Sequence, residues 1–385
     1  MDNPVTRISV RNLVEFILQS GDLDNRRGTI DKDAMLKGSR LHRKLQKQMG
    51  GDYRAEVALR MNCSYEDLDI RLEGRADGIF TEDGEIWIDE IKGTYGNLQA
   101  MEMPVPVHRA QAMCYGWIYG EKEGLSQIGI QMTYSHLDTE DTRRFREIFS
   151  MEELKKWYQE LLDAYHKWIA YSLSWKKERN ASMTDLQFPF PYREGQREIV
   201  SGVYHTVSSK KTLFVQAPTG VGKTMSAIFP SVRAIGEGKG ETLFYLTAKT
   251  ITGTVAWEAF HTLRENGLKF KVTAITAKEK LCFLDSPECT PEKCPYAKGH
   301  FDRVNDAVYE LLTSSDELNR EILEEQARKW KVCPYEMSLD VAVWVDAIIC
   351  DYNYVFDPHV NRKSLIEGSL RQNIYLIDEA HNLLD

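Results

Sequence analysis

Runs of apolar residues separated by helix-like segments make up the second half of the chain. The segments "TLFVQA" (212–217), "TLFYLTA" (242–248) and "NIYLIDEA" (373–380) are rich in apolar residues and alternate with helical sequence. This pattern is typical of strands in a parallel sheet that is covered on both faces. We therefore predict an α/β domain with a parallel sheet over residues 188–385.

The first half shows a different pattern, in which apolar and polar residues alternate along short strands. In "EGRADGIFTEDGEIWIDEIKGT" (73–94), two alternating runs flank Asp83-Gly84, a strong signal for a two-residue hairpin turn. Counting outward from this turn places Asp77 opposite Glu90 on one face, with Cβ atoms about 5 Å apart. Lys92 projects from the same face, so the hairpin predicts a cluster of two carboxylates and one lysine.

A helical bridge connects the two halves. Residues 151–187 begin with "MEELKKWYQELLDAYHKWIAYSLSWKKERN", which predicts one or two helices, and end in a polar linker that precedes two prolines. The predicted organisation is an α/β domain over residues 1–150, this bridge, and the parallel-sheet domain over residues 188–385. Within the last domain, residues 278–338 form a cysteine-containing insertion.

Composition fits a compact soluble protein. Of the 385 residues, 42% are apolar and 28% are charged, and no stretch approaches the roughly 18 apolar residues of a membrane span. The first residues lack the apolar core of a signal peptide, so we expect a cytoplasmic protein. The net charge of −9 argues against general binding to nucleic acid, so a DNA partner requires local clusters of basic residues.

The sequence "APTGVGKT" (217–224) lies between a predicted strand and a helical segment, which is the context that a phosphate-binding loop requires. Its backbone N–H groups can turn toward phosphates, Lys223 can reach the terminal phosphates, and the Thr224 hydroxyl can bind Mg²⁺. We predict that this loop binds ATP and that Lys223 is catalytic. The predicted ATP-binding residues of the loop are Thr219, Gly220, Gly222, Lys223 and Thr224.

Two further segments complete the predicted nucleotide site. Asp378 and Glu379 end the strand "IYLI", at the edge where open α/β sheets bind ligands. We expect Asp378 to hold Mg²⁺ and Glu379 to orient the attacking water. Upstream of the loop, Tyr192 is predicted to stack on adenine and Gln196 to contact the base edge.

These motifs resemble the superfamily 2 DNA helicases of the XPD and DinG type. The resemblance covers residues 188–385 and rests on "APTGVGKT", "YLTAKT", "CPYE" and "DEAH" in that order. It implies an ATP-driven motor that moves along single-stranded DNA in the 5′ to 3′ direction, with a role in repair or recombination. Helicases of this type close the nucleotide site with a second motor domain. We therefore expect this chain to be truncated and to bind ATP without brisk hydrolysis or unwinding.

Four cysteines, Cys282, Cys289, Cys294 and Cys333, lie between the phosphate-binding loop and Asp378. Their spacing lacks the two Cys-x-x-Cys pairs of a zinc ribbon, and two of them precede proline, as in ferredoxin motifs. An iron–sulfur cluster is favoured, while zinc and four unrelated thiols remain alternatives. The helicase resemblance implies a 4Fe–4S cluster on these cysteines. Ser314 and Glu317 fit a capping box for the helix before Cys333.

The hairpin residues Asp77, Glu90 and Lys92 form the constellation of a metal-dependent nuclease, although a solvated hairpin with a surface ion pair is the simpler interpretation. Other features accompany it. A helix carries Gly38-x-x-x-His42 beside a cationic stripe, Glu56 lies on a strand, and Gln111 and Tyr115 lie one helical turn apart. The stripe consists of Lys37, Arg40, Lys44 and Lys47.

Together these features resemble the PD-(D/E)xK nucleases of the RecB and CRISPR-associated type over roughly residues 10–150. The resemblance implies that Lys92 is catalytic, that Glu56 supports the site, and that Gln111 and Tyr115 contact DNA. It also implies Mg²⁺ or Mn²⁺ bound by His42, Asp77 and Glu90. Three functions follow as hypotheses: a nuclease–helicase acting on DNA, a DNA-binding module with an inactive nuclease, and a nucleoside triphosphatase unrelated to DNA.

Overall fold

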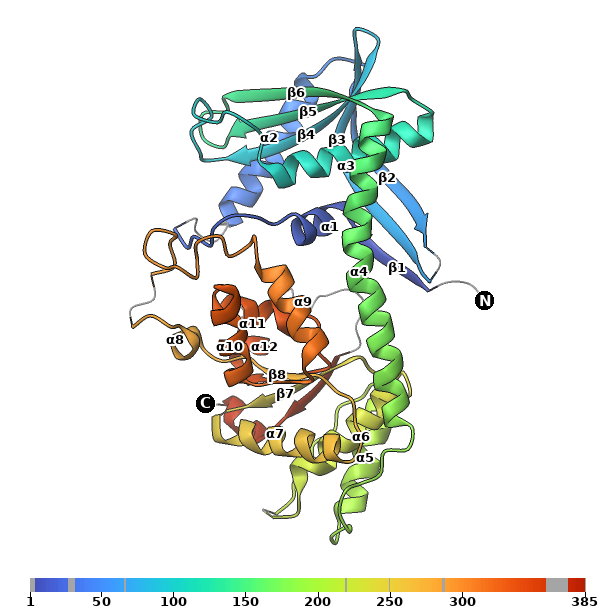
Figure 1. Cartoon of the computed structure of the whole chain (residues 1–385), viewed down its shortest axis with the longest axis vertical. Helices are drawn as coiled ribbons and strands as arrows, with labels where there is room; N and C mark the ends of the chain where they lie inside the picture. The colour runs from blue at the N-terminus through green and yellow to red at the C-terminus, as the bar shows by residue number, and fades with distance from the viewer. Residues whose placement is uncertain are drawn as a thin grey trace. The chain divides into compact units, whose positions relative to one another are not determined.

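The computed structural model describes residues 4–26, 32–65, 67–218, 220–248, 250–285, 288–357 and 373–384. The chain divides into two compact units (Figure 1). The first unit contains Met1–Ser20 and Asn25–Tyr171, and the second contains Gly21–Asp24 and Ser172–Asp385. The short segment Gly21–Asp24 therefore belongs to the second unit although it is surrounded in sequence by the first.

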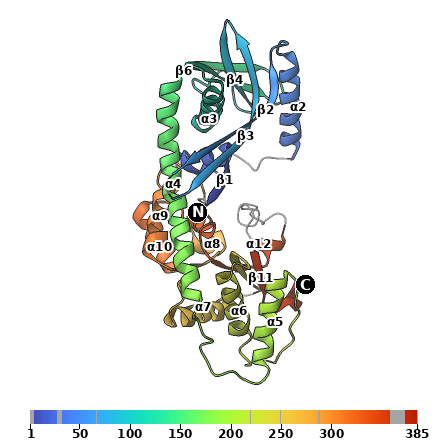
Figure 2. The ribbon, with the colours of Figure 1, turned by 90° about the vertical axis from the view of Figure 1, so that its right-hand side faces the viewer.

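The first unit is a mixed α/β fold. Its elements are β1 (Val5–Ser9), α1 (Val10–Ile17), α2 (Lys32–Gln48), β2 (Arg54–Ser64), β3 (Asp69–Glu82), β4 (Glu85–Thr94), α3 (Pro106–Glu123), β5 (Gln127–His136), β6 (Thr142–Ser150) and the start of α4 (Met151–Met183). The strands form one sheet in the order β1-β3-β4-β5-β6, with β2 also paired to β3. Helix α3 packs on β5 and β4, and α2 also contacts β4. Figure 2 shows strands of the sheet between these two helices.

The predicted hairpin is confirmed. Strands β3 and β4 pair antiparallel, with Glu82 opposite Glu85 and Gly78 opposite Asp89. Asp83 and Gly84 form the turn, and both have positive φ, 54° and 84°. Positive φ at both central residues is the geometry of a type I′ turn, which matches the twist of the flanking strands. The register therefore puts Asp77 and Glu90 at the next pair of positions along the hairpin.

The second unit contains a parallel sheet. Its described elements after α4 are α5 (Gln196–Ser209), α6 (Lys223–Gly236), β7 (Thr242–Thr247), α7 (Thr250–Glu265), β8 (Val272–Ala274), α8 (Lys278–Leu281), α9 (Val304–Ser314), β9 (Glu317–Leu318), α10 (Arg320–Trp330), α11 (Pro334–Ala342), β10 (Ala347–Asp351), α12 (Asn353–Phe356), β11 (Asn373–Ile377) and the 3₁₀ helix η1 (Ala380–Leu384). The strand order is β11-β7-β10-β8-β9. The predicted α/β class is confirmed in both units.

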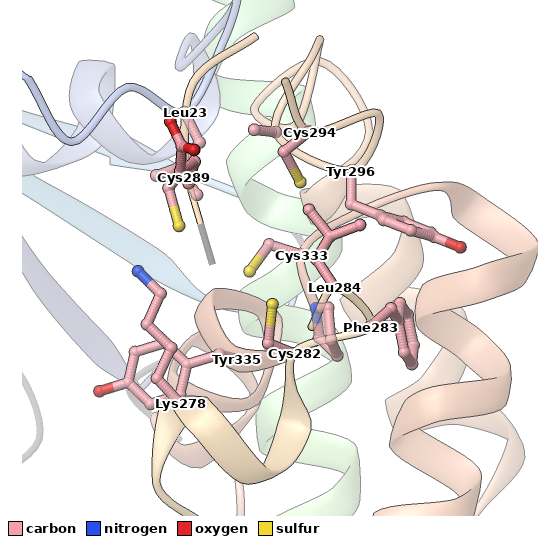
Figure 3. Close-up of a pocket in the computed structure, with 13 residues that line it drawn as sticks. Leu23, Lys278, Cys282, Phe283, Leu284, Cys289, Cys294, Tyr296, Cys333 and Tyr335 are labelled. Carbon is pink, nitrogen blue, oxygen red and sulfur yellow. The ribbon is translucent and has the colours of Figure 1, made fainter. Parts of the chain in front are cut away.

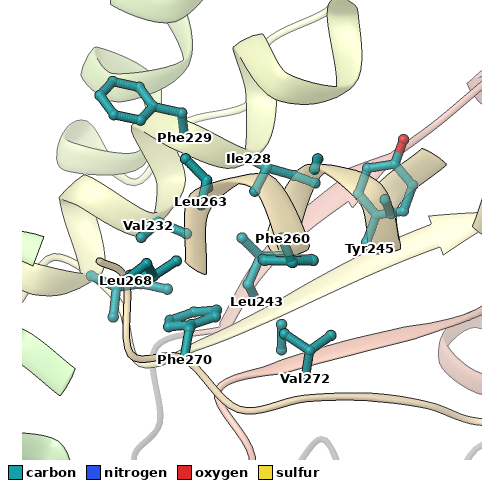
Figure 4. Close-up of a cluster of buried hydrophobic side chains, with 14 of the residues drawn as sticks. Ile228, Phe229, Val232, Leu243, Tyr245, Phe260, Leu263, Leu268, Phe270 and Val272 are labelled. Atoms are coloured by element: carbon teal, nitrogen blue, oxygen red, sulfur yellow. The ribbon is translucent and has the colours of Figure 1, made fainter. Parts of the chain in front are cut away.

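The core of the second unit lies between the sheet and the helices α6 and α7 (Figure 4). Ile228 and Val232 of α6 meet Phe260 and Leu263 of α7 over Leu243 of β7. These side chains recur at helical spacing on one face of each helix, so both helices bury an apolar stripe against the strands. This packing fixes the start of α6, where Lys223 lies.

One predicted strand is wrong. The segment "TLFVQA" forms no strand, and Phe214 at its centre is 88% exposed. Apolar character alone does not make a strand, because a strand in a sheet also needs a neighbour to pair with. Among the described strands, β11 pairs only with β7, and no described strand pairs with residues 212–217.

The predicted capping box before Cys333 is also wrong. Ser314 ends α9, and α10 begins after Asn319, whose side chain accepts a hydrogen bond from the Ile322 N–H at 3.0 Å. Asn is as good an N-cap as Ser, so the residue closest to the helix start takes the role. Helix α4 is one continuous helix, and no described helix has both the length and the apolar character needed to cross a bilayer.

Candidate functional site

The centre of the candidate nuclease site is Asp77 on β3. Strand β3 pairs regularly with Ala55 and Val57 of β2 but not with Glu56. Its pairing with β4 extends from the turn only as far as Gly78. Glu56 has φ of 56°, a conformation that non-glycine residues adopt rarely. The Ile91 N–H of β4 donates to the side chain of Asp77, at 2.7 Å from Oδ2. Asp77 therefore lies in a local break in the sheet.

A chain of hydrogen bonds connects Glu90, Lys92, Gln111 and Tyr115. Lys92 Nζ donates to Glu90 Oε1 at 2.8 Å and to Gln111 Oε1 at 3.1 Å. Gln111 Nε2 lies 3.3 Å from the Tyr115 hydroxyl. Gln111 is 7% exposed and Tyr115 is 3% exposed, so these two residues, which were predicted to contact DNA, lie behind Lys92. The absence of a side chain at Gly74 leaves space for the Tyr115 ring, because a Cβ at position 74 would lie 2.6 Å from it.

Helix α2 contributes two side chains, His42 and Gln46, to the surroundings of Asp77. His42 Nδ1 lies 3.6 Å from Asp77 Oδ1. One turn later, Gln46 Nε2 donates to the Asp77 carbonyl at 2.9 Å and to Glu56 Oε1 at 3.1 Å. Leu41 and Leu45 pack this helix against Ile91. The sequence analysis missed Gln46, whose only signal was its spacing of four residues from His42.

The electrostatics of the site favour a cation. Glu90 is 2% exposed, and its Oε2 atom has no hydrogen-bond partner among the residues that the structure describes. Burial and the negative charge of Asp77 raise the pKa of Glu90 to about 8, although Lys92 acts in the opposite direction. A divalent cation between the carboxylates would remove this repulsion and use the unpartnered oxygen. Among the described residues, no three His, Cys, Asp or Glu side chains are close enough together to hold a metal ion as placed. The suitability of this site for a cation therefore rests on the chemistry of its side chains.

The cationic stripe of α2 is partly neutralised. Lys37 pairs with Asp138 at 2.7 Å, and Lys44 pairs with Glu140. Both lysines remain about half exposed. Such exposed pairs contribute little to stability, and a phosphate can replace the carboxylate partner at a small cost. The stripe therefore still offers positive charge beside the nuclease site.

The described part of the phosphate-binding loop has the backbone that this motif needs. Gly220 and Gly222 have φ of 83° and 80°, which side-chain-bearing residues rarely adopt. Lys223 begins α6 and its Nζ lies 3.3 Å from the Ala217 carbonyl. Thr224 Oγ1 lies 3.5 Å from the hydroxyl of Tyr245 on β7. Thr219 lies outside the described residues.

The carboxylates at the end of β11 face this loop. Glu379 Oε1 lies 3.8 Å from Lys223 Nζ, and Glu379 has φ of 50°. The Tyr352 hydroxyl donates to the carbonyls of Asp378 and Glu379. The structure therefore brings Lys223 and Glu379 together. Tyr245 and Tyr352 were not predicted, because a tyrosine in an apolar strand or a short helix gives no functional signal.

Tyr192 and Gln196 are both engaged within the protein. Tyr192 stacks on Phe188 with ring centroids 4.4 Å apart, and the Arg197 guanidinium lies 4.9 Å from the Tyr192 ring. Gln196 is 4% exposed and accepts a hydrogen bond from the Arg193 N–H at 3.0 Å. The side-chain amide of Gln196 packs against Gly222 of the phosphate-binding loop, since a Cβ at position 222 would lie 2.7 Å from its nitrogen.

The four cysteines of the insertion line one pocket. Figure 3 shows the sulfur atoms of Cys282, Cys289, Cys294 and Cys333 directed toward the same space. All four are free thiols, and all except Cys282 are buried. Burial raises the pKa of the Cys333 thiol to about 11. Four thiol side chains around one pocket could hold a metal ion or an iron–sulfur cluster.

Two family models match the chain. The model of the PD-(D/E)XK nuclease superfamily matches residues 9–181, which include His42, Asp77, Glu90 and Lys92. The model described as DEAD_2 matches residues 262–385, which include the four insertion cysteines and Asp378. Both resemblances seen in the sequence are therefore confirmed.

Curated relatives match over about half of the chain. It is 24% identical over 247 residues to "Regulator of telomere elongation helicase 1 homolog" of Caenorhabditis briggsae, covering 52% of this chain and 24% of the relative. It is 24% identical over 249 residues to the human "Regulator of telomere elongation helicase 1", covering 51% and 20%. A segment of 65 residues is 37% identical to "Fanconi anemia group J protein homolog" of Gallus gallus, covering 17% and 5%. The chain spans a quarter or less of the length of these relatives.

Two solved structures match part of the chain with low scores. "XPD_Helicase" matches with a TM-score of 0.34 and 20% identity, covering 50% of this chain and 33% of that structure. "Crystal structure of SSO0001" matches with a TM-score of 0.27 and 18% identity, covering 40% and 75%.

Proposed function

We propose that this chain supplies a metal-dependent DNA nuclease site and the nucleotide-binding motor domain of an ATP-driven DNA helicase. The observation that carries the nuclease proposal is the grouping of Asp77, Glu90 and Lys92 on one hairpin, within the segment that the nuclease superfamily model matches. The family of the helicase relatives supports the motor assignment.

In the nuclease site, His42, Asp77 and Glu90 would hold Mg²⁺ or Mn²⁺. A bound divalent ion polarises the scissile phosphate and lowers the pKa of a bound water. Lys92 has three N–H donors, and Glu90 and Gln111 accept two of them. The third would hold the attacking water or a phosphate oxygen. Gln111 is then a positioning residue that fixes the direction of the ammonium group.

Glu56 and Gln46 support the metal-binding carboxylate. Gln46 holds the backbone of Asp77 and the side chain of Glu56 at once, and Arg75 Nη1 lies 3.3 Å from Glu56 Oε2. This arrangement keeps the break in the sheet open at Asp77. Fixed positions of the ligands matter, because displacement of about 1 Å can cost 100-fold in rate.

In the motor domain, the phosphates of ATP would lie on the loop that ends at Lys223, with Mg²⁺ held by Thr224 and Asp378. Glu379 would orient water, and Lys223 would exchange its contact with Glu379 for contacts to the terminal phosphate. Cys282, Cys289, Cys294 and Cys333 would hold a 4Fe–4S cluster. We further propose 5′ to 3′ movement on single-stranded DNA and a role in repair or recombination.

The test of the nuclease proposal is degradation of labelled single-stranded DNA by the purified chain. We expect cleavage with Mg²⁺ or Mn²⁺ and without ATP, and loss of cleavage in Asp77→Ala. An Asp138→Ala variant is the matched control, because Asp138 is an exposed carboxylate of the same unit that pairs with Lys37. Salt-dependent DNA binding without cleavage would instead identify a DNA-binding module with an inactive nuclease fold.

A further inference from the structure

A short segment from the start of the chain takes part in the cysteine insertion. The Leu23 N–H donates to the Ala297 carbonyl at 2.9 Å, and the Phe301 N–H donates to the Gly21 carbonyl at 3.0 Å. Asp22 Oδ1 accepts from the Gly299 N–H at 2.6 Å. In return, Asp302 Oδ1 accepts from the Gly21 N–H at 2.7 Å. We call residues Gly21–Asp24 the strap.

The strap contacts the part of the insertion that has least regular structure. Between the end of α8 at Leu281 and the start of α9 at Val304, the described residues form no helix or strand. Cys289 and Cys294 both lie in this loop. Turns within the loop pair some of its backbone N–H groups, and the strap accepts those of Gly299 and Phe301.

Leu23 lies on the wall of the pocket that the four cysteines line, and Figure 3 shows it beside Cys289. Its side chain is apolar and partly buried. The stability and potential of an iron–sulfur cluster depend on how far water and solutes reach it. An apolar side chain at this position reduces that access.

We propose that the strap forms one wall of the cluster-binding pocket, with Leu23 shielding the cluster and Asp22 fixing the loop after Cys294. This inference rests on the proposed 4Fe–4S cluster. The chain enters and leaves the strap from segments that belong to the first unit. The pocket is therefore completed by residues that lie outside the helicase-like part of the sequence.

The first experiment measures release of iron from the full chain, purified without oxygen, to a strong Fe²⁺ chelator. We expect Leu23→Asp and Asp22→Ala to release iron about 10-fold faster than the wild type, the range seen when groups around metal ligands are removed. Leu23→Met should behave as the wild type. Leu36→Asp is the matched control, because Leu36 is 60% exposed in the first unit.

The outcomes separate this inference from the cluster assignment. A wild-type chain without iron and acid-labile sulfide would overturn both. A wild-type chain that contains the cluster, with Leu23→Asp and Asp22→Ala both releasing iron at the wild-type rate, would overturn the strap alone.

A second measurement uses only the wild type, in case the variants fail to fold. Hydrogen exchange followed by mass spectrometry should show protection of the amides of Gly21 and Leu23 in the loaded protein. Removal of iron should abolish this protection while leaving helix α1 (Val10–Ile17) protected. Strap amides that exchange at the same rate with and without iron would contradict the proposal.

Discussion

The candidate nuclease site and the candidate nucleotide site differ in how their strands are held. Strand β3, which carries Asp77, pairs with β2 on one side and β4 on the other except at the local break, and Lys92 is fixed by two acceptors. Before Lys223, the apolar segment "TLFVQA" is exposed and forms no strand. Asp378 follows β11, whose only described partner is β7.

The difference follows from the distance along the chain between the parts of each site. Asp77, Glu90 and Lys92 belong to one hairpin, and a tight turn is enough to bring them together. The loop at Lys223 leads into α6 and the carboxylates at Asp378 follow β11, so the two parts are far apart in sequence, and parallel strands pair only through long connections. A hairpin site is thus specified locally, whereas a site at the edge of a parallel sheet depends on distant partners.

The largest expected effect tests the completeness of the hairpin site. Glu90→Ala and Lys92→Ala should each lower the rate of DNA cleavage at least about 100-fold, because both side chains act on the reacting groups. Binding of a fluorescent ATP analogue should be unchanged. Lys122→Ala, an exposed lysine near the end of α3 in the same unit, should retain most of the activity. Cleavage that persists in both site variants would show that another site is responsible.

The second effect tests whether the loop at Lys223 binds ATP although residues 212–217 before it form no strand. Lys223→Ala should weaken binding of ATP by about 10-fold or more, since a hydrogen bond to a charged group contributes about 1.5 to 3 kcal/mol. Isothermal titration measures this change. Lys269→Ala, an exposed lysine of the same unit, should bind as the wild type. Equal affinity in Lys223→Ala and wild type would mean that the loop does not hold phosphates.

A smaller effect tests the support behind the hairpin. Gln46→Ala should reduce cleavage by about fivefold, because it removes hydrogen bonds worth roughly 1 kcal/mol from the backbone of Asp77 and from Glu56. Single-turnover cleavage with saturating metal measures it. Gln159→Ala on α4 provides the comparison for an exposed glutamine. If Gln46→Ala cleaved at the wild-type rate, Asp77 would not depend on α2 for its position.

The smallest effect compares two phenylalanines in apolar runs. Phe214→Ser should change the free energy of unfolding by less than about 0.5 kcal/mol, because the side chain is exposed. Phe244→Ala on β7 should cost about 3 to 5 kcal/mol, because Phe244 is buried. Urea denaturation followed by circular dichroism gives both values. A cost at Phe214 as large as that at Phe244 would show that "TLFVQA" is packed in solution.

The sequence was informative where the signal was local. Asp83-Gly84 specifies its turn through backbone conformation, so the register that brings Asp77 to Glu90 followed by counting. The residue type and order of the four cysteines predicted one shared site, and all four line one pocket. In each case, the residues that decide the geometry are the residues that carry the motif.

The sequence failed where the deciding partner lies elsewhere. "TLFVQA" has the apolar pattern of a strand, but no residue within it specifies the neighbour that would pair with it. Gln46 is an ordinary helical glutamine until the fold brings Asp77 and Glu56 to it. The strap "GDLD" has no pattern that would predict contact with a loop near residue 299.

The strap also sets an order of events during synthesis. Asp22 and its partner Gly299 are separated by 277 residues, so the strap leaves the ribosome long before that loop exists. At about 5 to 20 residues per second, the delay is about 15 to 60 s. During this time the hairpin of the first unit has all of its partners and can fold. Closure of the cysteine pocket, and with it stable retention of metal, must then wait until the last third of the chain has emerged.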